Sequence, residues 1–262
     1  MTLGTSKVFT ITVSNLTSPM NFGEAMNTVK LSENTNTANM ITEVLQHIDR
    51  YRLTVLEALQ RLPVFSELRS QQVRRILRKL ERRALIAAAP LHRGVLYWYM
   101  LPKGSQRLGL ADDRSGPLSE PAKIRAYALL RFCWLSEKPR VRLTRGDIAT
   151  RLPEFDRPGL PSLYYFEASG SGVLGIARVD AGHRGRWYRI VQTLRDDIDA
   201  HLRGPAWRRL ITAGRFEFTL LTVFPEKAER IRETLAQHPD VGRAKVQVIA
   251  LPELLPFITS NI

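Results

Sequence analysis

Cysteine is almost absent from the sequence, and long apolar runs are absent altogether. Cys133 is the single cysteine among 262 residues, which excludes an intramolecular disulfide and suits a reducing cytoplasm. No run of about 18 apolar residues could cross a bilayer. Residues 1–7 lack the charged-then-apolar order of a secretory signal. We therefore expect a cytoplasmic protein that has no membrane-spanning segment.

Acidic residues are scarce relative to basic ones. The chain has 39 Lys and Arg against 25 Asp and Glu, a formal charge of +14 and a pI near 10.5. Such an excess favours polyanionic partners, either nucleic acid or an anionic membrane. Residues 1–37 are neutral in sum, residues 38–110 hold 13 basic against 5 acidic side chains, and residues 111–262 hold 24 against 18. The cationic excess is therefore densest in residues 38–110.

Patterns for catalysis and metal binding are missing as well. The five histidines are scattered, and none stands at metal-ligand spacing from another histidine or from Cys133. Asp180 ends a candidate strand, but the lysine that a metal-dependent nuclease needs does not stand nearby in the sequence. Three further aspartates share a candidate helix with arginines, which predicts a salt-bridged surface; they are Asp196, Asp197 and Asp199. We predict no catalytic residue, no metal site and no cofactor.

Two short helices are expected at the start of the basic block, in residues 39–61. Apolar residues recur there at helical spacing, at Ile41, Val44, Leu45 and Ile48. Thr54 and Glu57 form a capping-box pattern that would open the second helix. Residues 1–37 before them are polar and weakly charged, so they predict a flexible tail, with one possible strand at residues 8–13.

Residues 70–85 carry the clearest helical pattern. Apolar residues form one face, at Val73, Ile76, Leu77, Leu80 and Ala84, and Ser70 is a candidate N-cap. A hairpin should follow, from residues 85–89 through Gly94 to residues 95–101, which are rich in aromatic and branched side chains. Two helices, a basic helix and a two-stranded ribbon are the order of a winged-helix domain, which we expect to span residues 38–110.

The basic helix is the predicted DNA-binding element. A helix fits the major groove, where its N-terminal residues meet base edges while Lys and Arg hold phosphates. The candidate base-reading residues are Ser70, Gln71, Gln72 and Arg75. The candidate phosphate contacts are Arg74, Arg78, Lys79, Arg82 and Arg83. Arg93 would place a cation at the tip of the ribbon, although a plain turn arginine explains it equally well, and residues 97–99 are expected mainly in the core rather than stacked on bases.

The second half of the chain has an α/β pattern after a linker at residues 111–120. Residues 121–136 form a helix that is apolar on most sides, which would be buried in its own domain or in a subunit interface. Strands are predicted at residues 163–167, 173–180, 216–223 and 245–251. Helices are predicted at residues 186–202, 205–213 and 226–238. The runs at 216–223 and 246–251 are almost continuously apolar, as in interior strands.

The chain resembles the replication-relaxation family of plasmid and mobile-element proteins over residues 39–255. The N-terminal match is VRRILRKLERRALIAAAPLHRGVLYWYMLPKGSQRL, including Lys103-Gly104, and the C-terminal match comprises GVLGIARVDAG and RFEFTLLTVFPEKAERIRETL. The resemblance implies a winged helix followed by a core similar to PD-(D/E)XK nucleases. Ser162 and Arg178 stand where family members carry acids, so only Asp180 is kept and the nuclease-like domain, residues 121–262, should be inactive.

These observations predict an α+β, non-enzymatic, sequence-specific double-stranded DNA-binding protein of a mobile element. It would act as a transcriptional regulator or as an accessory factor in plasmid replication or transfer. We expect a homodimer on a palindromic site, with contacts from the helix at residues 121–136 and from the α/β domain. The alternative is a metal-dependent nuclease or relaxase with an atypical active site. A membrane-surface protein is disfavoured because no exposed amphipathic helix is left outside the predicted folds.

Overall fold

A computed structural model describes residues 33–92, 94–111, 114–138, 140–156, 163–168, 172–180, 182, 187–238 and 241–259. The fold combines α-helices with one two-stranded and one mixed five-stranded sheet, which confirms the predicted α+β class. The candidate strand at residues 8–13, and Arg93 at the expected ribbon tip, lie outside the described residues.

Three helices open the described chain. They are α1 (Glu33–Tyr51), α2 (Leu56–Gln60) and α3 (Ser70–Arg82), with a short 3-10 turn, η3 (Pro63–Phe65), between the last two. The apolar faces of these helices enclose one core that includes Val44, Leu59 and Leu77. Helix α1 begins within residues 1–37, which were expected to form a flexible tail, so the ordered unit starts earlier than predicted.

Thr54 does not cap a helix. Its backbone N–H and C=O instead pair with Trp98 in an antiparallel bridge, with both N···O distances at 2.9 Å. The residue before α2 is Val55, which makes no side-chain cap. The capping-box prediction is wrong here because the hairpin satisfies the polar backbone groups of Thr54, and the threonine becomes a one-residue third strand of the hairpin.

The hairpin follows α3 as predicted. Strand β1 (Ile86–His92) pairs antiparallel with β2 (Val95–Met100). Between α3 and β1, Ala84 has a φ of 54°, and the Leu85 N–H bonds the Leu80 carbonyl at 3.1 Å, which is a Schellman ending. Ala84 is exposed rather than part of the apolar face predicted for it, because the helix has already ended before this residue.

Both faces of the hairpin are covered. Trp98 packs in the core with α1 and α3, whereas Tyr97 packs on the opposite side with α5, so the core placement expected for these aromatics is confirmed. Helix α4 (Pro102–Arg107) then folds back beneath the hairpin. Its Gly104 lies so close to Leu85 that an added Cβ would stand 2.3 Å from the Leu85 carbonyl oxygen, so this position requires glycine.

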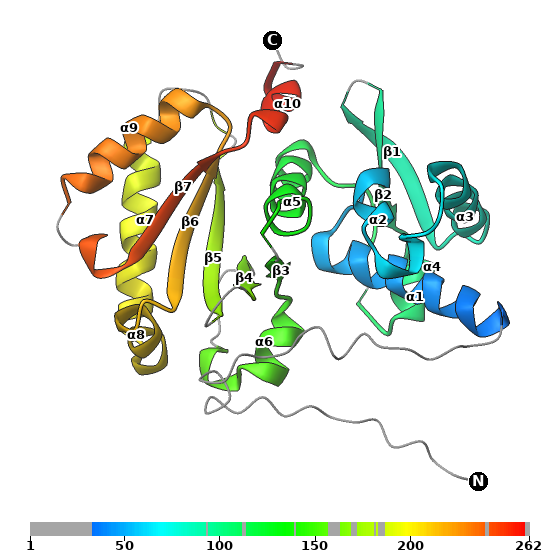
Figure 1. The fold of residues 1–262 in the computed structure, drawn as a ribbon, viewed down its shortest axis with the longest axis horizontal. Coiled ribbons are helices and arrows are strands. Elements are labelled where there is room, and N and C mark those ends of the chain that lie inside the picture. Colours follow the sequence, from blue (N-terminus) through cyan, green and yellow to red (C-terminus); the bar gives the residue numbers. More distant parts are fainter. Residues whose placement is uncertain are drawn as a thin grey trace, which may run out of the picture.

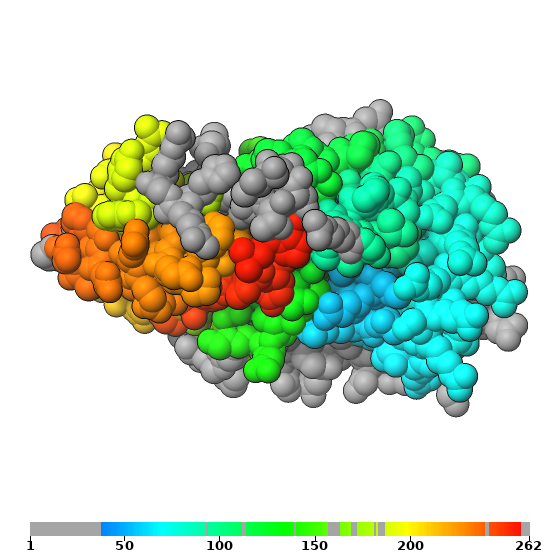
Figure 2. Space-filling view, turned by 90° about the horizontal axis from the view of Figure 1, so that it is seen from above, coloured from blue at the N-terminus to red at the C-terminus, as the bar shows by residue number. Residues whose placement is uncertain are grey.

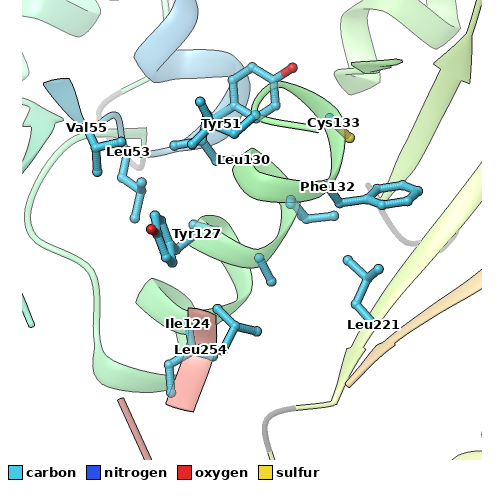
Figure 3. Packing of buried hydrophobic residues seen from close by; sticks show 14 of the residues in the cluster. Tyr51, Leu53, Val55, Ile124, Tyr127, Leu130, Phe132, Cys133, Leu221 and Leu254 are labelled. Carbon is cyan, nitrogen blue, oxygen red and sulfur yellow. The ribbon is translucent and has the colours of Figure 1, made fainter. Parts of the chain in front are cut away.

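Helix α5 (Glu120–Cys133) lies between the N-terminal helices and the large sheet (Figure 1). Tyr51 and Leu53 meet it from one side, while Leu221 lies on the other side, beyond Phe132 (Figure 3). The helix is therefore buried within the chain, and it has no free apolar face for the dimer contact that was expected of it. Its burial joins the two halves through a single core.

The predicted linker is packed as well. Within its described part, Arg114 pairs with Asp49 of α1 at 3.1 Å. The Gly116 N–H bonds the Met100 carbonyl at 2.9 Å, and the Leu118 N–H bonds the Tyr97 hydroxyl at 3.3 Å. The turn-forming composition of residues 111–120 correctly predicted a connecting segment between two helices. Because this segment makes the contacts above, it does not act as a flexible linker between the two halves of the chain.

The large sheet has the order β3-β4-β5-β6-β7. Its strands are β3 (Arg140–Arg142), β4 (Tyr164–Glu167), β5 (Val173–Asp180), β6 (Phe216–Thr222) and β7 (Lys245–Ala250). The helices after β3 are α6 (Arg145–Arg151), α7 (Trp187–Leu202), α8 (Pro205–Thr212), α9 (Pro225–Ala236) and α10 (Leu255–Thr259). Short 3-10 turns lie at η5 (Pro153–Phe155), η6 (Val241–Arg243) and η7 (Pro252–Leu254).

The sheet combines two kinds of pairing. Strands β3, β4 and β5 are antiparallel neighbours, while β5, β6 and β7 run parallel. Helices α7 and α9 cover one face and α5 covers the other (Figure 1), so consecutive residues of β6 point into different cores: Leu220 to the first and Leu221 to the second. Residues 216–222 are buried throughout, as expected of an interior strand.

The prediction that β7 is an interior strand is wrong. It lies at the edge of the sheet, and most of its residues are only partly buried. Its apolar side chains pack against α9 and its neighbours, and this contact explains the apolar composition without a second strand beyond it. Seen from above, the molecule is elongated, with the N-terminal unit at one end and α9 at the other (Figure 2).

Candidate nucleic-acid interface

Helix α3 has one buried face and one strongly basic face. Val73, Leu77 and Leu80 are buried against α1 and the hairpin. Every candidate contact residue on the helix and just after it is exposed: Ser70, Gln71, Gln72, Arg74, Arg75, Arg78, Lys79, Arg82 and Arg83. The helix lies at the edge of the N-terminal unit away from the large sheet (Figure 1). The basic face is therefore exposed to solvent on a helix at that outer edge.

The first turn of α3 is fixed by two side-chain hydrogen bonds. Ser70 is the first helical residue rather than the N-cap, a position that Arg69 occupies. The Gln72 Oε1 atom accepts the Arg69 backbone N–H at 2.8 Å, and the Ser70 Oγ atom accepts from Gln60 Nε2 at 2.8 Å. Within the predicted base-reading end, the side chains of Ser70 and Gln72 thus have partners inside the protein, whereas the side chains of Gln71 and Arg75 form no hydrogen bond or ion pair with the described part of the chain.

The acidic residue of α3 is turned away from the basic face. Glu81 accepts a hydrogen bond from the Trp98 indole N–H at 3.0 Å, and it is partly buried. Among the described residues, no carboxylate forms an ion pair with the six cations of residues 74–83. The positive charge of this face is therefore left uncompensated by the fold.

The end of the hairpin is the second exposed element near α3. Gly94 has a φ of 73°, a left-handed backbone conformation that glycine adopts more easily than any other residue. It is also exposed. Leu96 beside it is 46% exposed. The proposed contact of Arg93 lies outside the described residues, so its position is not assigned.

An acid–lysine pair, which the sequence analysis did not find, lies at the carboxyl edge of the parallel strands. Asp180 at the end of β5 binds Lys227 of α9, with Oδ2···Nζ at 2.6 Å, and the Lys227 side chain is 2% exposed. No lysine is near Asp180 in the sequence, but Lys227 is next to it in the folded protein, so the expectation that Asp180 lacks a lysine partner is wrong. Because β5 and β6 are parallel, the carboxyl end of β5 and the start of the helix after β6 lie at the same edge of the sheet. A parallel pairing of these two strands would have predicted the contact.

Two further carboxylates that are close to β5, those of Glu167 and Asp197, have basic partners of their own. Glu167 pairs with Arg140 at 2.7 Å and lies opposite Val173 at the other end of β5, which is about 23 Å along the strand from Asp180 at about 3.3 Å per residue. Asp197 binds Arg178 through both carboxylate oxygens, at 2.6 and 2.5 Å. The salt-bridged role expected for the α7 aspartates is found at Asp197, although its partner lies on β5 rather than on α7.

No family model, curated protein or solved structure matches this chain.

Nothing in the described residues forms a metal centre. They contain no group of three or more His, Cys, Asp or Glu side chains that could hold an ion. No helix among them is long and apolar enough to cross a membrane.

Two buried titratable groups have shifted pKa values. Burial raises the pKa of the Cys133 thiol to about 12, so the thiol stays protonated as a structural residue. Burial, with Arg50 nearby, lowers the pKa of His47 to about 3, so this histidine is neutral.

Proposed function

We propose that the protein binds double-stranded DNA sequence-specifically by placing α3 in the major groove. The observation that carries this proposal is the exposed basic face of α3, whose cations have no acidic partner among the described residues. Released counterions would supply sequence-independent affinity. Gln71 and Arg75 would read base edges, since they are exposed in the N-terminal half of α3 and their side chains have the geometry to pair with adenine and guanine.

The order of the elements supports a winged helix. Helices α1, α2 and α3 precede the β1–β2 hairpin, and Thr54 adds a one-residue strand beside Trp98. In such domains the third helix enters the groove and the hairpin tip lies over the adjacent backbone. The exposed Gly94 end of the hairpin suits that second contact.

We further propose a role as a transcriptional regulator or as an accessory factor in replication or transfer of a mobile element, as the family resemblance implies. A homodimer would match a two-fold operator. Because α5 is buried inside the chain, the dimer contact would have to come from another surface. Analytical ultracentrifugation with and without a selected DNA site tests this part of the proposal.

Binding can be tested by a gel shift on duplexes selected from a random pool. The double variant Arg75→Ala/Arg78→Ala removes two cations from the α3 face. The control, Arg230→Ala/Arg243→Ala, removes two exposed arginines from α9 and η6. We expect only the α3 variant to lose affinity, with the slope of log K against log salt reduced by up to about 2. Equal losses in both variants, or none in the first, would refute the assignment of α3.

A metal-dependent nuclease is the second candidate, and the Asp180–Lys227 pair favours it. If α6 and α8 are left aside as insertions, the order α5, β3, β4, β5, α7, β6, with an antiparallel meander followed by a parallel strand, is also that of a PD-(D/E)XK core. Against it, the described residues contain no group of three or more His, Cys, Asp or Glu side chains that could hold a metal ion, and Asp197 is bound to Arg178. We propose that this core is an inactive scaffold.

A plasmid-nicking assay with Mg²⁺ or Mn²⁺ separates the two candidates. We expect the wild-type protein to leave supercoiled plasmid intact. Cleavage by wild-type protein that disappears in Asp180→Asn, while urea denaturation shows that this variant is still folded, would establish the nuclease reading instead.

A further inference from the structure

A cavity of about 450 Å³ lies where the N-terminal unit meets the α/β unit. Its wall combines Arg50 at the end of α1, Trp134 after α5, strand β3, helix α6, and the residues that flank β4, β5 and β6. A space of this size lies within the roughly 300–1,000 Å³ range of small-molecule sites. No residue of α3 lines the cavity, so DNA bound to the exposed face of that helix would not fill it.

The inner wall of the cavity is mainly apolar. The side chains that define it are aromatic or branched: Trp134, Leu143, Phe155, Phe166, Leu174 and Leu210. All six follow α5 in the chain, and several of them belong to the two large cores. An occupant must therefore have an apolar body, because a highly polar or multiply charged molecule would leave its own groups without partners there.

The charged residues that line the cavity are predominantly basic. Six of them are Lys or Arg, against two acids, Glu137 and Asp147. Some of the cations are engaged; Arg50 binds Asp147 at 2.7 Å, for example. Lys138 and Arg151 are exposed at the cavity and form no ion pair within the described residues. The charge here is suited to an anion that needs only one or two basic partners.

We propose that this cavity binds a small apolar carboxylate, such as a medium-chain fatty acid or an aromatic acid, with its carboxylate toward Lys138 and Arg151. The apolar wall takes the hydrocarbon part, and the surplus of basic side chains selects the anion over a neutral molecule of the same shape. This assignment does not depend on whether α3 binds DNA.

Isothermal titration calorimetry of the full chain with decanoate tests the proposal, with 1-decanol as the neutral analogue. We expect saturable binding at one site, with decanoate at least about tenfold tighter than decanol, which corresponds to one charge–charge contact of moderate strength. Absence of saturable decanoate binding, or equal affinity for decanol, would overturn the proposal.

Two pairs of variants place the ligand. Arg151→Gln removes a lining cation, and Arg145→Gln removes an exposed arginine of the same helix that does not line the cavity. Ala168→Trp puts a large side chain at an exposed lining position, and Ala236→Trp puts one on the exposed end of α9. We expect weaker decanoate binding in Arg151→Gln and loss of binding in Ala168→Trp, with both controls unchanged. Equal effects within either pair would overturn the assignment to this cavity.

Discussion

Trp98 of β2 donates its indole N–H to the Glu81 carboxylate of α3 at 3.0 Å. This contact draws the acidic side chain of the basic helix toward the hairpin, and it ties the predicted recognition helix to the strands that follow it. The same bond therefore serves two purposes: it fixes the orientation of α3 on the hairpin, and it keeps negative charge off the exposed face.

Replacing Glu81 with Gln should separate these two effects. The amide can still accept from Trp98, so the fold should be retained, while the loss of one negative charge beside the basic face should raise affinity for any duplex severalfold at about 0.1 M salt. Fluorescence anisotropy with a labelled duplex measures the change. Glu233→Gln, on the exposed side of α9, makes the same charge change away from α3 and should leave affinity nearly unchanged; an equal gain there would show that net charge alone controls binding.

The two ends of α3 should respond differently to mutation. Arg75→Ala should lower affinity for a selected site by about 1–3 kcal/mol and relax base preference at one position, because this residue is placed to read a base. Arg78→Ala should weaken all duplexes to the same extent and reduce the salt slope by about 1, because it is placed to hold a phosphate. Selection from random pools, repeated with each variant, measures both properties. Identical base preferences in the two variants would contradict this division of roles.

Ala84 adopts a left-handed conformation, with φ at 54°, immediately after α3. Glycine reaches this conformation without the Cβ strain that costs other residues about 1–2 kcal/mol, so Ala84→Gly should raise the free energy of unfolding by about 1 kcal/mol. Ala149→Gly in the middle of α6 should lower it by a similar amount, since glycine is a poor helix former. Urea denaturation distinguishes these opposite signs, and a loss of stability in Ala84→Gly would show that the helix ending is not strained.

The sequence predicted those elements whose pattern is local. The basic helix was expected from residue 70 onward, and it begins at Ser70 because its apolar residues repeat at helical spacing. Strand β5 matches its predicted bounds, Val173–Asp180, because branched residues there are flanked by glycine. In these segments the local preference and the final packing agree, so the pattern was sufficient.

The elements that were missed depend on distant partners. Strand β3 has only three residues, Arg140–Arg142, and two of them are arginines. Arg140 can be buried because Glu167 of β4 binds it at 2.7 Å. The sequence of residues 140–142 does not predict that partner. The Asp180–Lys227 pair was not predicted for the same reason. Its two residues meet only when β5 and β6 pair, because Lys227 lies on the helix that follows β6.

The burial of α5 shows a different kind of limit. An apolar helix was predicted correctly, but its sequence could not distinguish a domain core, a subunit interface and a junction between two halves of one chain. Which of these environments the helix occupies depends on residues that precede and follow it in the sequence, such as Leu53 and Leu254. Composition can show that a surface must be covered, but it does not show what covers it.

Asp147 of α6 joins the two units through a bond to Arg50 of α1, with Oδ2···Nη1 at 2.7 Å. Its oxygen also accepts from the Thr144 backbone N–H at 2.8 Å and hydroxyl at 2.9 Å. Burial alone would raise the pKa of Asp147, but the Thr144 bonds and the Arg50 charge outweigh it and hold this pKa below the usual value for an aspartate. The ionised form is therefore the one that the fold stabilises.

A carboxyl group whose pKa is lower in the folded than in the unfolded protein stabilises the fold above the unfolded pKa, and this contribution is lost as the pH falls through the folded pKa. Asp147→Asn should thus reduce the free energy of unfolding by about 1–3 kcal/mol at pH 7. The difference from wild type should begin to shrink below about pH 4, where the carboxyl group of the unfolded chain becomes protonated, and should disappear as the pH falls through the lower pKa of the folded protein. Urea denaturation at pH 7, 4 and 3 measures it. Asp156→Asn changes an exposed aspartate and should show no such pH-dependent difference. A deficit for Asp147→Asn that stayed constant down to pH 3 would mean that the charge of Asp147 is not what joins α6 to α1.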